Sequence, residues 1–273
     1  MITLLTDFGT RDSYVAEMKA VILRLNSQAA IVDVTHEIEP QAVAEGAVVL
    51  GRAYQVFAPD AVHIAVVDPD VGTARNALLL MTPEGRFLAP DNGLITYAVR
   101  ESPEYEKAIA GAGFLQAVAV PIPAGFAAYR LSNEALWRRP VSDTFHGRDV
   151  FAPVAAHLSL GLPPQEVGEP VASLTCLSIP HPRRRGDEIA GHVVHVDRFG
   201  NLSTTIGGDA VEGRDVGVAV GGNRIRGISR SYAEGGELLA VIGSGGSLEI
   251  AVRDGSAARS LGVRVGEPVV VRL

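Results

Sequence analysis

The 273-residue chain contains a single cysteine, Cys176, and only two lysines, Lys19 and Lys107. One cysteine excludes a disulfide within the chain, and it is more simply a buried or linker residue than a nucleophile. Because lysine is so rare, arginine supplies nearly all of the positive charge. This bias fits either the composition of the genome or a hot habitat, and the sequence does not distinguish them.

The sequence also lacks a long hydrophobic run and an excess of positive charge. No apolar segment approaches the roughly 20 residues of a membrane-spanning helix, so we expect no membrane partner. The chain begins as a strand-like run with a carboxylate at Asp7, unlike a signal peptide, so we expect a cytoplasmic protein. The net charge of −7 argues against a nucleic-acid partner, whose binding favours a basic surface. The basic cluster Arg183-Arg184-Arg185 is most simply a solvated linker.

Strand-like and helix-like patterns alternate through the first part of the chain. The predicted strands cover residues 2–5, 31–34, 62–67 and 77–81, and the predicted helices cover 13–25, 43–54 and 150–160. Ser13 is the expected N-cap of the first helix. Such alternation is typical of an α/β domain with a largely parallel sheet and flanking helices. We place this domain at residues 1–165.

The pattern changes after Gly161-Leu162-Pro163-Pro164. Residues 166–186 carry prolines, arginines and serines without clear periodicity, and we expect them to form a connector. Beyond them, short β-like runs follow one another at 188–196, 216–220, 223–228, 238–242, 248–252 and 268–273. Runs this short, separated by glycine and aspartate, favour a small all-β, barrel-like domain at residues 187–273.

Polar residues gather where predicted elements meet loops. The segment Val67-Asp68-Pro69-Asp70-Val71-Gly72-Thr73-Ala74-Arg75 follows a predicted strand and holds two carboxylates and an arginine beside turn-forming residues. Asp7 follows the first strand, and Asp91-Asn92 and His146 lie at two further junctions. Open α/β sheets bind ligands at the carboxyl ends of their strands. We therefore expect these side chains to form a site.

Five segments in one order resemble a known enzyme family. They are Thr6-Asp7-Phe8-Gly9-Thr10, Val67-Asp68-Pro69-Asp70-Val71-Gly72-Thr73, Ala89-Pro90-Asp91-Asn92-Gly93, Thr144-Phe145-His146-Gly147-Arg148-Asp149 and Asp197-Arg198-Phe199-Gly200-Asn201. The family is that of the S-adenosyl-L-methionine (SAM) hydroxide adenosyltransferases, or adenosine-forming SAM hydrolases, relatives of the fluorinases and chlorinases. The resemblance covers residue 2 to the C-terminus. It implies the same two domains, hydrolysis of SAM to adenosine and L-methionine without a metal or organic cofactor, and a homotrimer with sites between subunits.

The resemblance implies that Asp68, Arg75 and His146 are catalytic and hold a water at C5′ of the ribose. Arg75 can keep Asp68 ionised through a charge-assisted hydrogen bond, and either Asp68 or His146 can accept the water's proton. Without the resemblance, a structural Asp–Arg pair and a histidine at a helix start are the simpler interpretation.

Asp7 is implied to bind the ribose hydroxyls, as an acidic residue at a strand end does in dinucleotide-binding folds. The first strand is not followed by GxGxxG, so a dinucleotide site is not expected. The alternative for Asp7 is an N-cap or an Asx-turn before Gly9.

In the second domain the resemblance implies contacts from Asp197 to the methionine amino group and from Asn201 to the adenine, with Phe199 and Tyr232 offering rings for stacking. The segment is one residue shorter between Asp197 and Phe199 than in fluorinases, which makes Asp197 the less secure assignment. Ser244 matches a serine that binds the methionine carboxylate.

Fluorinases carry an arginine where this chain has Gly245, so recognition of the carboxylate must differ here. Glu249 is a further candidate for substrate binding. On an alternating strand, however, Glu249 is equally well explained as a solvent-facing residue.

Three alternatives remain open. A metal-dependent phosphoesterase could draw its ligands from Asp7, Asp68, Asp70, Asp91, His146 and Asp149, although no His-x-His or Asp-x-His spacing occurs. A SAM-dependent halogenase is disfavoured, because Asp68 would repel a halide by several kcal/mol in a poorly solvated pocket. A non-catalytic SAM- or adenosine-binding protein would not need the set of Asp68, Arg75 and His146.

Overall fold

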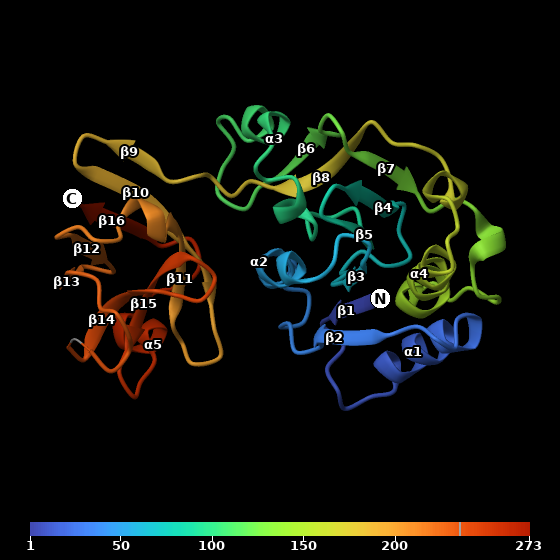
Figure 1. The fold of residues 1–273 in the computed structure, drawn as a ribbon, viewed down its shortest axis with the longest axis horizontal. Helices are drawn as coiled ribbons and strands as arrows, with labels where there is room; N and C mark the ends of the chain where they lie inside the picture. Colours follow the sequence, from blue (N-terminus) through green and yellow to red (C-terminus); the bar gives the residue numbers. More distant parts are fainter. Residues whose placement is uncertain (235) are drawn as a thin grey trace. The chain divides into compact units, whose positions relative to one another are not determined.

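The computed structural model describes residues 1–234 and 236–273, which form two compact units, Met1–Ser178 and Ile179–Leu273 (Figure 1). The division lies inside residues 166–186, the segment expected to be a connector. This segment includes two strands, β8 (Ser173–Leu177) and β9 (Arg183–Arg185). β8 pairs with β6 (Ala117–Pro121) in the first unit, and the exposed β9 pairs with the first long strand of the second. Strands this short acquire their structure from pairing partners, so periodicity did not indicate them.

A six-stranded mixed sheet forms the first unit, in the order β2-β1-β3-β5-β4-β7. Its strands are β1 (Ile2–Thr6), β2 (Ile31–Thr35), β3 (Val62–Val66), β4 (Ala77–Thr82), β5 (Gly85–Pro90) and β7 (Ala127–Arg130). The strands β2, β1, β3 and β5 run parallel, whereas β4 is antiparallel to both β5 and β7. The predicted α/β class is confirmed, and β5 and β7 are additions that their short, poorly alternating sequences did not indicate.

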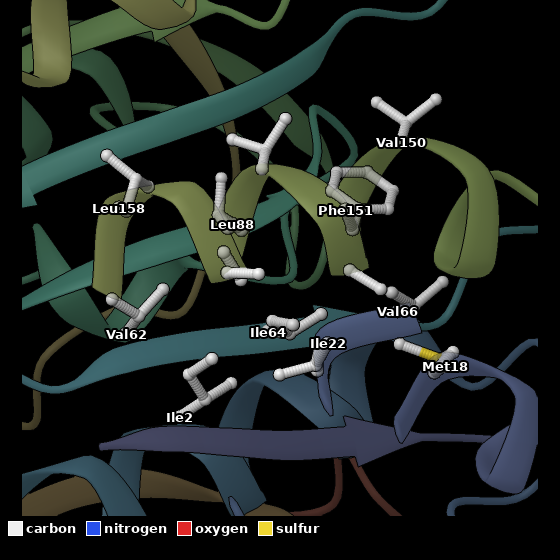
Figure 2. Close-up of a cluster of buried hydrophobic side chains, with 14 of the residues drawn as sticks. Ile2, Met18, Ile22, Val62, Ile64, Val66, Leu88, Val150, Phe151 and Leu158 are labelled. Carbon is white, nitrogen blue, oxygen red and sulfur yellow. The ribbon is translucent and has the colours of Figure 1, made fainter. Parts of the chain in front are cut away.

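Helices cover both faces of this sheet. α1 (Tyr14–Leu25) and α4 (Ala152–Ser159) pack on the face that carries Ile2, Ile64 and their neighbours, as Figure 2 shows. α2 (Val43–Ala53) and the short α3 (Pro103–Ala108) contribute to the apolar cluster on the other face, which includes Leu5 and Ala65. Because successive strand side chains point to opposite faces, one strand supplies both clusters.

The start of α1 differs in detail from the prediction. Ser13 is the residue before the helix, but its side chain makes no capping bond to the backbone. Its hydroxyl instead donates to Glu17 Oε1 at 2.7 Å.

An antiparallel eight-stranded sheet forms the second unit, in the order β13-β12-β16-β10-β11-β15-β14, with β9 paired to β10. Its elements are β10 (Glu188–Val196), β11 (Leu202–Gly207), β12 (Gly217–Val220), β13 (Asn223–Arg226), β14 (Leu238–Ile242), β15 (Ser247–Val252), α5 (Ala257–Leu261) and β16 (Pro268–Arg272). The sheet curves into a nearly closed barrel around one apolar core, so the predicted barrel-like domain is confirmed. β11 was missed because its polar sequence, LSTTIG, lacks an apolar run.

None of the helices in residues 1–234 and 236–273 is long and apolar enough to cross a membrane.

Candidate active site

The loops that carry Asp7 and Asp68 begin side by side at the carboxyl edge of the sheet. β1 and β3 are parallel neighbours, and Thr6 lies opposite Val66. Asn92 follows the next parallel strand, β5, and its side-chain amide donates to the carbonyl of Val67 at 2.8 Å. Asn92 therefore fixes the backbone immediately before Asp68.

Arg75 joins Asp68 to His146. Its Nε donates to Asp68 Oδ1 at 3.0 Å, and its Nη2 donates to Asp68 Oδ2, which makes the pair bidentate. The same Nη2 lies 2.8 Å from His146 Nδ1. The side chains of Asp68 and Arg75 are only 4% and 9% exposed, so water screens their interaction little. The three residues predicted from the sequence are therefore gathered in one cluster.

The contact with Arg75 sets the protonation of His146. A guanidinium has donors and no acceptor, so Nδ1 of His146 must accept this hydrogen bond. The imidazole is then neutral and carries its proton on Nε2. Burial, and then the positive charge of Arg75, lower the pKa of His146 below its usual value, which agrees with a neutral ring.

A close backbone contact brings the loop after β3 to the segment that carries His146. Gly72 has a φ of +78°, and a Cβ at this position would lie 2.4 Å from the carbonyl oxygen of Asp143. Only glycine satisfies both conditions without displacement of the chain. His146 then precedes the π-helix η4 (Gly147–Phe151), a rare element that often occurs at functional sites.

The buried side chain of Asp149 stabilises the loop around His146 through hydrogen bonds. Its carboxylate is fully buried, accepts from Arg148 at 2.8 and 2.9 Å and from Arg138 at 3.0 Å, and accepts from the amide of Ser142 at 2.9 Å. These bonds lower the pKa of Asp149 despite its burial, which by itself would raise it. Arg148 also donates to Glu17 on α1. Asp149 is thus a structural anchor for the His146 loop.

Asp7 does not form the Asx-turn before Gly9 that was the alternative to a ribose contact. Its Oδ2 accepts from the amide of Gln41 at 2.8 Å, and the amide of Gly9 donates to the carbonyl of His36 at 2.7 Å. The side chain of His36 in turn lies 2.9 Å from the hydroxyl of Thr6, so the start of the Asp7 loop is fixed from inside the unit. Within the described residues, the bond from Gln41 to Oδ2 is the hydrogen bond that the Asp7 carboxylate accepts.

In the second unit Asp197 organises the turn between β10 and β11. Its Oδ1 accepts from the amides of Phe199 and Asn201 at 2.9 and 2.8 Å, and its Oδ2 accepts from the side chain of Asn201 at 2.9 Å. Asn201 is buried, whereas the ring of Phe199 is 76% exposed. An exposed ring on a rigid turn is available for stacking against a ligand.

Glu249 is buried, so the interpretation of it as a solvent-facing residue is wrong. It is 7% exposed, accepts from the hydroxyl of Ser203 at 3.2 Å and accepts from the hydroxyl of Tyr232 at 3.2 Å. The cross-strand partner Ser203 on β11 explains this, since both residues face the same side of the sheet. Burial, and then the negative charge of Glu249, raise the pKa of Tyr232. Ser244 lies on the exposed β14–β15 turn.

The residues considered as metal ligands of a phosphoesterase do not come together in one site. Asp91 accepts from the amide of Thr175 at 2.6 Å, and Asp149 is enclosed by arginines. In the part of the chain that the structure describes, no three His, Cys, Asp or Glu side chains are arranged to hold a metal ion.

The sequence did not single out the supporting residues Gly72, Asn92, His36 and Asp149 for the roles they have here. Asn92, Gly72 and Asp149 lie within the five segments, but their roles depend on contacts with residues far away in the chain. His36 lies outside those segments, and no local pattern indicates its bond to Thr6.

Two family models match the chain in sequence order. The SAM hydroxide adenosyltransferase N-terminal domain matches residues 2–168, and the SAM hydroxide adenosyltransferase C-terminal domain matches residues 191–270.

Comparisons with individual proteins agree with these two family matches. The (R)-S-adenosyl-L-methionine hydrolase of Thermus thermophilus is 40% identical over 272 residues, which cover 98% of each chain. The crystal structure of an uncharacterized conserved protein from Thermotoga maritima is 37% identical and superposes with a TM-score of 0.85 over 100% of both chains. A fluorinase of Nocardia brasiliensis is more distant, at 26% identity over 100% of this chain and 97% of its own.

Proposed function

Because the chain belongs to the SAM hydroxide adenosyltransferase family, we propose that it hydrolyses (R)-S-adenosyl-L-methionine to adenosine and L-methionine. The observation that carries this proposal is the buried cluster in which Arg75 contacts both Asp68 and His146. The full-length similarity to an (R)-SAM hydrolase supports the choice of substrate and reaction.

The reaction needs an oriented water more than it needs an acid. The oxygen of water attacks C5′ of the ribose in line with the C5′–S bond, and the electron pair of that bond moves to the sulfonium sulfur. Methionine then leaves as a neutral thioether, so the leaving group takes no proton. The protein must hold the water in line and keep other water away.

We assign the acceptance of the water's proton to Asp68. His146 Nδ1 already accepts from Arg75, so the neutral ring has no free lone pair. Each oxygen of Asp68 accepts from Arg75 and retains a second lone pair for the water. His146 Nε2–H remains as a donor that can orient the oxygen of the same water. The proton passes from Asp68 to solvent after the reaction.

Substrate contacts are proposed at the positions that match the family. Asp7 binds the ribose diol in the first unit. In the second unit Asn201 and the ring of Phe199 bind the adenine, with Tyr232 as a further ring. Asp197 and the buried Glu249 bind the ammonium group of the methionine part. Ser244, on an exposed turn, binds its carboxylate.

Water is a better nucleophile for this site than a halide. A halide placed against the ionised Asp68 would be repelled in a site screened so little by solvent. The lower identity to the fluorinase than to the hydrolase agrees with this choice. A purely SAM- or adenosine-binding protein would have no use for the coupling of Arg75 to His146.

Two further properties are proposed from the family resemblance: the reaction proceeds without a metal or an organic cofactor, and the chain acts as a homotrimer. A cytoplasmic location is proposed from the sequence, with its single cysteine. Full activity after treatment with a strong chelator, a trimer mass in solution and recovery in the cytosolic fraction are the expected results.

The direct test is to incubate the purified protein with SAM and separate the products by chromatography. Adenosine and methionine should appear in equal amounts. In water enriched in oxygen-18, the label should enter the 5′-hydroxyl of adenosine. Adenosine that forms without label on that oxygen would exclude attack by water on C5′.

A further inference from the structure

The first unit contains a cavity of about 750 Å³ that does not belong to the candidate active site. It is lined by residues of the 3-10 helix η1 (Tyr54–Val56) and the loop that follows it, by the turn between β4 and β5, by residues 97–99 and 101–104, and by the loop between β6 and β7. η1 precedes β3, and the β4–β5 turn precedes β5, so the cavity lies at the amino ends of the parallel strands. Asp7 and Asp68 lie at the opposite edge of the sheet.

The functional groups that line the cavity are mainly aromatic rings and carboxylates. The rings belong to Tyr54, Phe57, Tyr97 and Phe126, and the carboxylates belong to Glu84, Glu101 and Glu104. The described residues that line the cavity include no lysine, arginine or histidine. The lining residues themselves therefore offer negative charge and aromatic rings, and the positive charge nearby comes from a residue outside the lining, Arg100.

Tyr54 is held in the wall by two contacts. The hydroxyl of Tyr54 donates to Glu84 Oε2 at 3.1 Å, and its ring packs edge-on against Phe87 with centroids 5.1 Å apart. Burial, then the charge of Glu84 and also that of Glu101, raise the pKa of Tyr54 to about 12. The field of both carboxylates therefore reaches this wall.

One ring of the cavity already holds a cation. The guanidinium of Arg100 lies 5.6 Å from the centre of the Tyr97 ring and pairs with Glu101 at 3.1 Å. Glu101 is thus partly neutralised, whereas Glu84 and Glu104 face the cavity without a basic residue in its lining. An added cation finds the same combination of ring and carboxylate that Arg100 uses.

We propose that this cavity is a second binding site of the protein, for a small alkylated ammonium cation. Such a cation is attracted by ring faces within about 6 Å and by the carboxylates beside them. The volume falls in the range of roughly 300–1,000 Å³ that is usual for small-molecule sites. An anion or a strongly hydrated metal ion would not gain from four aromatic rings.

Choline and its neutral isostere 3,3-dimethylbutan-1-ol test the role of the charge. We expect choline to bind saturably, by isothermal titration calorimetry of the full chain, at least about tenfold more tightly than the isostere. Equal affinity for the two probes, or no saturable binding of choline, would overturn the proposal.

Two variants test whether choline binds in this cavity. Phe126→Leu removes a ring but leaves an apolar side chain, and Glu104→Gln removes a charge; each should weaken choline binding several-fold. Glu106→Gln is the matched control, because Glu106 lies on the same helix but does not line the cavity. Binding that is unchanged in both variants, or weakened equally in the control, would refute the site. The readout is binding of choline, so it is independent of SAM hydrolysis.

Discussion

At the scale of single residues, the guanidinium of Arg75 joins a carboxylate and an imidazole at the end of β3. One side chain thereby holds the carboxylate of Asp68 in place and sets the tautomer of His146. A lysine could not do both, because its ammonium lacks the planar fork that makes the bidentate contact. The assignment of the proton to Asp68 depends on this geometry.

Asp68→Asn should separate chemistry from binding. The substitution removes the charge that polarises water but nearly keeps the size of the side chain, so SAM should still bind. We expect kcat and kcat/KM to fall together, by about 10²-fold or more. Asp7→Ala should instead mainly weaken the binding of SAM and adenosine, because the ribose contact exists in the ground state too. Steady-state kinetics of both variants measure the difference. A nearly normal kcat in Asp68→Asn would make Asp68 a binding residue.

His63 should make the first unit less stable in acid. It is fully buried, its Nδ1 lies 2.8 Å from the hydroxyl of Thr3, and burial lowers its pKa from 6.5 to about 4. Between these values the unfolded chain binds more protons than the folded chain, so the free energy of unfolding rises with pH. The contribution is complete above pH 6.5 and is lost as the pH falls toward 4, to a maximum of about 3 kcal/mol.

Urea unfolding followed by the fluorescence of Trp137, the only tryptophan, measures this effect for the first unit. His63→Phe keeps a ring against Phe87, on which His63 stacks at 5.1 Å, and cannot titrate. Between pH 4 and 6.5, the free energy of unfolding of the variant should rise less steeply with pH than that of the unsubstituted protein. An identical slope in both proteins would show that His63 is not the group responsible.

At the scale of elements, the site depends on how two loops meet. The loop after β3 carries Asp68 and Arg75, and the segment before η4 carries His146. Gly72 permits the contact between them, and Asp149 closes the second loop on itself. Neither arrangement involves one of the proposed catalytic side chains directly, so the effect of each on catalysis is indirect.

Gly72→Ala should lower kcat without removing any catalytic group. The added Cβ would lie 2.4 Å from the carbonyl oxygen of Asp143, so the loop must move away and carry Arg75 from His146. Misplacement by about 1 Å can cost about 10²-fold in rate, and we expect at least a tenfold fall. Gly161→Ala is the control, because Gly161 has a similar φ of +94° with nothing within 4 Å of its Cβ position. Equal activity in the two variants would mean that the Asp143 contact does not matter.

At the scale of the whole molecule, the proposed substrate contacts are distributed over both units. Asp7, Asp68, Arg75 and His146 belong to Met1–Ser178, and Asp197, Asn201 and Glu249 belong to Ile179–Leu273. Neither unit alone contains the complete set. The homotrimer proposed from the family resemblance would combine them across subunits, through the heterologous contacts of a closed ring.

Subunit mixing tests this assembly. Asp68→Ala and Asn201→Ala proteins should each be inactive, and they should regain part of the activity when mixed after dissociation. A mixed trimer contains some sites in which both contributing units are intact. Labelled subunits must show that exchange has occurred, and each variant mixed with itself is the control. Exchange without any recovery would indicate sites built within one chain.

The two-domain class and most strands with a clear apolar run follow from the sequence alone, because short-range periodicity records them. The set of Asp68, Arg75 and His146 follows from the resemblance of five ordered segments to a family. The burial of Glu249, the hydrogen bond from Arg75 to His146 Nδ1 and the place of β8 in the first unit are visible only in the tertiary structure. Each of these depends on partners far apart in the chain: Ser203 for Glu249, 46 residues away, and Arg75 for His146, 71 residues away. Burial and protonation are properties of such neighbours, and a linear pattern does not specify them.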